Sequence, residues 1–80
     1  MHELGVLRQV MKTVGAIAEQ NHIQRVKYIT LEVGTQSTYV PAYLTKLYPV
    51  AADPYPPLRN TELRIAMVSG RGMTIKEIGY

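Results

Sequence analysis

The stretch RVKYITLEV, residues 25–33, decides the fold that the rest of the chain can adopt. Apolar side chains at Ile29, Leu31 and Val33 alternate with more polar ones, which is the period-two pattern of a strand with one buried face. Gly34 ends this pattern and opens a polar turn. We therefore expect a strand whose apolar face must be covered by other parts of the chain.

Two segments with helical periodicity flank this strand and can supply the cover. Residues 4–20 carry apolar side chains at steps of three and four, and residues 39–48 repeat the pattern over a shorter length. Asn21 is a good helix stop, and Ser37 or Thr38 is the candidate N-cap of the second helix. The apolar stripe of the first helix consists of Leu4, Leu7, Val10, Met11, Val14, Ile17 and Ala18.

Prolines punctuate the segment after the second helix. Pro49 is expected to kink or end that helix, because proline removes a helical hydrogen bond and clashes with the preceding turn. Three further prolines follow before residue 60, so residues 49–60 predict an ordered, extended connector.

The C-terminal part of the chain predicts two more strands. Residues 61–68 alternate cleanly, whereas residues 73–78 are less regular because Ile75 and Ile78 would face opposite sides. The sequence SGRG, residues 69–72, predicts a tight turn and hence an antiparallel hairpin. The predicted fold is α+β, a three-stranded sheet with two helices on one face in the order helix-strand-helix-strand-strand, and residues 1–80 form a single domain.

Composition excludes several kinds of chemistry. The 80 residues contain no cysteine, which excludes disulfides, a thiolate nucleophile, iron–sulfur clusters and zinc sites built from cysteine. Nine Lys plus Arg stand against six Asp plus Glu, a mild net charge of +3 with no basic run, so nucleic-acid binding is not expected. The sequence has no membrane-length apolar run and no signal-peptide pattern, so we expect a cytoplasmic protein without a membrane partner.

Met1, His2 and Glu3 are the candidate metal ligands. The α-amine, the amide nitrogen of residue 2 and the imidazole of His2 close a five-membered and a six-membered chelate ring on a metal that displaces the amide proton. Nickel(II) and copper(II) favour square-planar nitrogen sites of this kind. Glu3 offers a fourth ligand through its amide nitrogen or its carboxylate. The alternative, a terminus with no such role, stays open on these residues alone.

No other constellation supports chemistry. His22 follows the end of the first helix without a partner at ligand spacing, and the glutamates on the strands fit solvent-facing ion pairs. No nucleophile–base pair can be drawn, so the sequence predicts a protein that is not an enzyme.

The chain resembles the HypA/HybF family of hydrogenase nickel-incorporation proteins over nearly its whole length. The order and spacing of its segments carry this resemblance more than any single motif does. The matching segments are MHELGVLRQVMKTV (1–14), YITLEVG (28–34), VPAYLTKLYPVAAD (40–53), NTELRIAMV (60–68) and SGRGMTIKEI (69–78).

The resemblance implies a cytosolic nickel metallochaperone. Such proteins bind nickel at the N-terminus, here at Met1, His2 and Glu3, and help to deliver it to [NiFe]-hydrogenase precursors and in some bacteria to urease. Their partners are a HypB-type GTPase and the hydrogenase large subunit. Some family members also form homo-oligomers.

Two departures from the family pattern bear on these expectations. The zinc domain with two Cys-x-x-Cys pairs, normally inserted between the last two strands, is absent, and the turn at residues 69–72 stands in its place, so no zinc is expected. In the turn after the first strand, the family commonly has Gly-Glu where this chain has Gly34-Thr35. Some members also have an acid near the start of the second helix, close to the nickel, where residues 38–41 have none. The alternative function is a small protein-interaction module that kept the scaffold and lost metal delivery.

Overall fold

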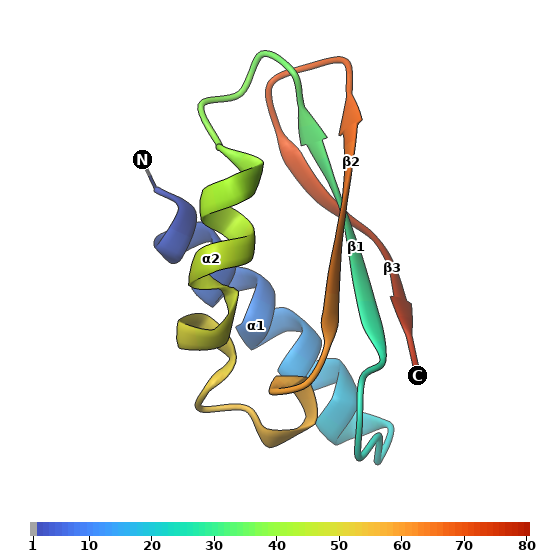
Figure 1. The fold of residues 1–80 in the computed structure, drawn as a ribbon. Helices are drawn as coiled ribbons and strands as arrows, with labels where there is room; N and C mark the ends of the chain where they lie inside the picture. Colours follow the sequence, from blue (N-terminus) through green and yellow to red (C-terminus); the bar gives the residue numbers. More distant parts are fainter. Residues whose placement is uncertain (1) are drawn as a thin grey trace.

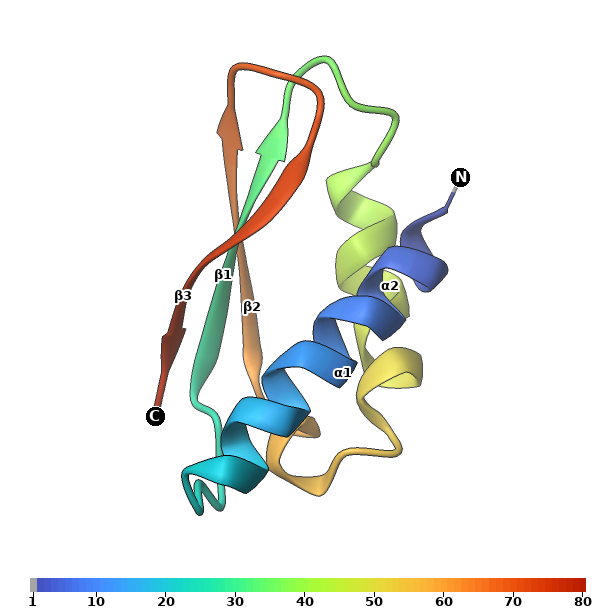
Figure 2. The same cartoon turned by 180° about the vertical axis from the view of Figure 1, so that it is seen from behind.

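The computed structural model describes residues 2–80, which form two layers (Figure 1). The elements are α1 (Glu3–Gln20), β1 (Tyr28–Gly34), α2 (Pro41–Ala52), a 3-10 turn η1 (Pro56–Leu58), β2 (Glu62–Val68) and β3 (Met73–Gly79). Both helices lie on the same side of the sheet, as the view from behind confirms (Figure 2). The predicted α+β class and element order are correct.

The strand predicted to decide the fold is the central one. β1 pairs in parallel with β2 and antiparallel with β3, so the sheet order is β2-β1-β3. Ile29, Leu31 and Val33 are completely buried beneath the helices. The outer face of the sheet is polar, and there Arg64 stacks over the Tyr28 ring at 3.9 Å and pairs with Glu62 at 3.1 Å.

The predicted antiparallel hairpin of the last two strands is wrong. β1, α2 and β2 form a βαβ unit, which places β2 beside β1 and leaves only the far edge of β1 for β3. The 69–72 segment crosses the end of β1 and accepts its hydrogen bonds. The N–H groups of Gly34 and Gln36 donate to the carbonyls of Gly72 and Gly70, at 2.8 and 2.9 Å. Gly70 has φ +120°, a conformation that favours glycine.

A β-bulge explains the irregular pattern of the last strand. Glu77 pairs with Thr30 and Ile75 with Leu31, so Lys76 is an extra residue on β3. The bulge brings Ile75 and Ile78 to the same face, opposite Leu31 and Ile29 of β1. The two isoleucines can therefore both pack toward the helices.

The second helix differs from its predicted bounds. It continues through Pro49 to Ala52, because its last turn is anchored by the buried side chains of Ala51 and Ala52. The predicted extended connector is therefore a helical turn followed by η1. Neither Ser37 nor Thr38 is the N-cap, since that position is occupied by Val40 without a side-chain cap. The predicted stop at Asn21 is correct, and its amide side chain donates to the Ile17 carbonyl at 2.8 Å.

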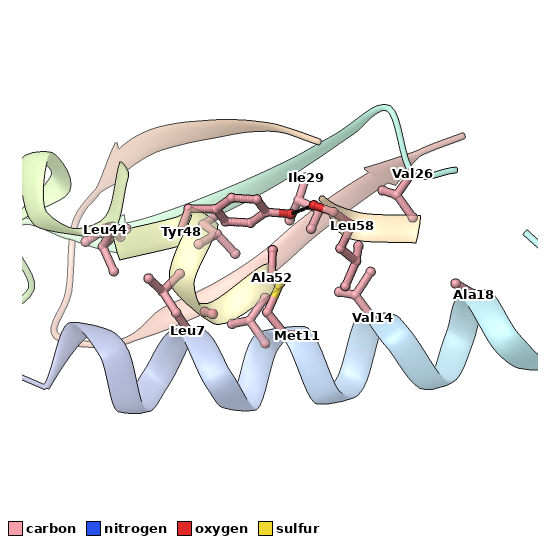
Figure 3. Close-up of a cluster of buried hydrophobic side chains, with 14 residues drawn as sticks. Leu7, Met11, Val14, Ala18, Val26, Ile29, Leu44, Tyr48, Ala52 and Leu58 are labelled. Atoms are coloured by element: carbon pink, nitrogen blue, oxygen red, sulfur yellow. Dashed lines mark hydrogen bonds between the residues drawn. The ribbon is translucent and has the colours of Figure 1, made fainter. Parts of the chain in front are cut away.

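The core lies between the apolar stripe of α1 and the inner face of the sheet, with α2 and η1 closing its end (Figure 3). Tyr48 of α2 contributes its ring to this core and is only 5% exposed. Its hydroxyl donates to the buried carbonyl of Leu58 at 2.8 Å, the dashed line in Figure 3. This bond ties α2 to η1, and burial raises the pKa of the Tyr48 phenol.

Replacing Tyr48 by phenylalanine should lower the free energy of unfolding by about 1–2 kcal/mol, because the buried Leu58 carbonyl would lose its short bond from the hydroxyl and keep only the 3.4 Å bond from the Thr61 N–H. Tyr43→Phe is the matched control, since Tyr43 lies on the same helix and is 52% exposed. Urea denaturation of both variants measures the difference. Equal stabilities would show that the Tyr48 hydroxyl contributes nothing to the attachment of η1.

Candidate metal centre

His2 occupies the N-cap position of α1. Its side chain is exposed and makes no capping hydrogen bond to the helix. The imidazole is therefore not committed to the fold of the helix, which is what a ligand for an external metal requires.

The backbone amides around His2 precede the hydrogen-bonded part of the helix. The first ladder bond runs from the Val6 N–H to the His2 carbonyl, at 2.9 Å. The amides of His2 and Glu3 belong to the helix start, where N–H groups have no acceptor within the helix. A metal that displaces a proton from the His2 amide would therefore break no bond of the helical ladder.

The Glu3 carboxylate has a structural partner on the second helix. It is 4% exposed and accepts a hydrogen bond from the Val40 N–H at 2.9 Å, 37 residues away in the sequence. The pKa of Glu3 is lowered, first by this bond from Val40 and next by its own backbone N–H. Of the two ligand modes predicted for Glu3, the carboxylate mode competes with the bond from Val40. The amide mode keeps that bond and removes the donor N–H of Glu3 itself.

The candidate centre lies where two helices begin. α1 and α2 start at the same end of the molecule, which is also the end where β1 and β2 finish (Figures 1 and 2). The Glu3 carboxylate thus sits at the positive dipole ends of both helices, a favourable place for a negative charge. Residues 38–41 contain no acidic side chain. At Val40 this segment instead donates its backbone N–H to the Glu3 carboxylate.

Two of the three predicted ligand residues, His2 and Glu3, lie within the described part of the chain. Met1 lies outside the described residues. Within residues 2–80 no group of three or more His, Asp or Glu side chains comes together to hold a metal. His22 is exposed at the opposite end of α1, just beyond Asn21, with φ +54°. The hydrogen bond from Val40 to Glu3 was not predicted from the sequence. The sequence shows only an acidic residue in the first turn of a helix, which does not indicate a partner 37 residues away.

Comparison with known proteins identifies the class. A family model described as hydrogenase/urease nickel incorporation metallochaperone matches residues 1–78. The chain is thus a nickel metallochaperone by class, not an enzyme. It belongs to the HypA family.

A solved structure agrees with this fold. The solution structure of the nickel metallochaperone HypA from Helicobacter pylori superposes with a TM-score of 0.86 at 11% identity, covering 99% of this chain and 97% of that one. At this identity the match supports the fold alone. A search of curated proteins finds no match. Neither described helix is both long and apolar enough to cross a membrane.

The Glu3 carboxylate should make stability depend on acidity. Because its pKa is lowered in the folded state, its contribution is present above the ordinary carboxyl range and is lost as pH falls through the lowered folded value. Glu3→Gln should therefore show a shallower loss of melting temperature than the wild type between about pH 5 and pH 3. Glu19→Gln, an exposed position on the same helix, is the control. Parallel melting curves for Glu3→Gln and the wild type would contradict the assignment.

Proposed function

We propose that the chain binds one nickel(II) ion through the α-amine of Met1, the amide nitrogen of His2 and the imidazole of His2, whenever Met1 carries a free α-amine. The amide of Glu3 is the proposed fourth ligand. The observation that carries this proposal is the exposed, uncommitted imidazole of His2 directly before the hydrogen-bonded part of α1.

Electrostatics at the helix start favours deprotonated amides as ligands. The positive dipole end of α1 disfavours a bare cation but stabilises negative charge. An amide nitrogen that has lost its proton supplies that charge directly at the metal. The Glu3 carboxylate, held by Val40 at 2.9 Å, adds a second negative group close by without leaving its place in the fold.

The nickel is cargo, and the proposed use is maturation of [NiFe]-hydrogenase or urease. The family supports this role. Delivery would proceed through protein contacts with a HypB-type GTPase and the hydrogenase large subunit, in the cytoplasm. Since the chain has no cysteine, these contacts cannot rely on a cysteine-bound zinc module within residues 1–80.

Nickel titration of a chain shown by mass to begin at Met1 tests the site. At about pH 7.5 we expect a yellow, diamagnetic one-to-one complex with d–d absorption typical of nitrogen ligands. His2→Ala should abolish it. His22→Ala should leave it unchanged, because α1 separates the two histidines by about 27 Å. If the wild-type chain binds no nickel, the alternative applies, a protein-interaction module that kept the scaffold and lost the metal.

Nickel affinity should fall steeply with acidification. The amine, imidazole and amide nitrogens bind nickel only without the protons that acid supplies, so binding releases protons and acid opposes it. Calorimetric titrations at about pH 7.5 and pH 5.5 measure the change, with a chain extended before Met1 as the control for loss of the amine. An affinity that is equal at both pH values would exclude the proposed ligands.

A further inference from the structure

A groove of about 370 Å³ runs between α1 and the C-terminal end of α2. One wall is the face of α1 formed by Gly5, Arg8, Gln9 and Lys12, at helical steps of three and four. The other side and the floor are apolar: Val50, Ala51, Pro54 and Tyr55. Ala51 at its floor belongs to the core, and the groove shares no residue with the candidate metal ligands.

The charges of this groove have one sign. Arg8 and Lys12 are the charged residues that line it, and both are exposed. Neither forms an ion pair within the part of the chain that the structure describes, where the pair found is Arg64 with Glu62. Like charges four residues apart slightly destabilise a helix, so the stability of α1 gives no reason for this arrangement. A negatively charged ligand bound between Arg8 and Lys12 would account for it.

The apolar side of the groove restricts what that ligand is. Val50 is 54% exposed, so its side chain presents apolar surface to solvent at the edge of the groove. A small anion would gain nothing from this surface, whereas a peptide with both acidic and aliphatic side chains would use both walls. From Gly5 to Lys12 this wall extends about 10 Å, the length of two turns of a bound helix, and its two cations lie about 6 Å apart along the axis.

A second groove on the other flank of α1 provides a contrast. Val6, Val10, Thr13, Met73 and Ile75 are among its lining residues, and none of the residues lining it is charged. Of the two grooves that flank α1, the one beside α2 therefore specifies the charge of its ligand.

We infer that the groove between α1 and the end of α2, with Arg8 and Lys12 on one wall and Val50 on the other, binds an acidic amphipathic peptide segment of a partner protein. Charge complementarity supplies the orientation and the apolar floor supplies the contact area. This surface lies along the helix whose first residues form the candidate nickel site, so one partner could contact both.

The test uses the full chain, labelled with nitrogen-15, and two synthetic probe peptides. The first probe has about twelve residues, with glutamate and leucine at helical spacing. The second has glutamine at every glutamate position. We expect the glutamate peptide to shift the amide signals of Gly5, Lys12 and Val50, which line this groove and not the Met73 groove. The glutamine peptide should bind at least about tenfold more weakly.

Matched charge reversals locate the binding. The double variant Arg8→Glu with Lys12→Glu should weaken the glutamate peptide about tenfold or more. Arg25→Glu with Lys27→Glu changes the net charge equally at exposed positions outside the groove and should change affinity less than about twofold. Val50→Ser should also weaken binding. All three variants alter exposed residues, and their amide spectra verify the fold.

Several results would overturn the inference. They are equal binding of both peptides, equal losses in the two charge-reversal variants, signal changes confined to the Met73 groove, or displacement of the peptide by millimolar inorganic phosphate. The Arg8 and Lys12 variant should keep its nickel, because neither residue is a proposed ligand. A loss of peptide binding can therefore be distinguished from a loss of nickel binding.

Discussion

The burial of the inner face of β1, the central strand, is the constraint on which the other elements depend. Its inward side chains Ile29, Leu31 and Val33 have no exposed surface, and its backbone hydrogen bonds are satisfied by a strand on each side. A strand so placed needs two neighbours and a helical cover. The βαβ crossover supplies β2 and α2, the bulged β3 takes the remaining edge, and α1 covers the inner face. The 69–72 segment then has to cross the end of β1, where Gly34 and Gly70 allow two backbones to meet closely.

A second constraint joins the two helices where they begin. The Glu3 carboxylate accepts the Val40 N–H, so the first residue of α1 is tied to the residue that caps α2. This contact defines the surroundings of His2 although it involves no proposed ligand atom. At the start of α2 this chain presents the Val40 N–H as a donor. The negative charge at this end of the molecule is the Glu3 carboxylate, which belongs to α1.

α1 combines three separate uses along one helix. Its apolar stripe builds the core, its first residues carry the proposed nickel ligands, and its flank toward α2 presents Arg8 and Lys12. The helical period keeps these uses apart, because residues three and four apart share a face while their neighbours point elsewhere. Substitutions on one face can therefore be designed to leave the others intact.

Local patterns of the sequence determined which segments form helices and strands, the apolar stripe of α1, its stop at Asn21 and the place of His2 before the helix. These features depend on neighbours within a few residues, so periodicity and capping preferences reveal them. The irregular facing of Ile75 and Ile78 was visible in the sequence, but the bulge at Lys76 that resolves it was not predicted. The strand order, the continuation of α2 through Pro49 and the bond between Val40 and Glu3 were decided only by the tertiary structure. Each depends on contacts between segments far apart in the chain, and no local propensity encodes which distant partner buries a given strand or helix end.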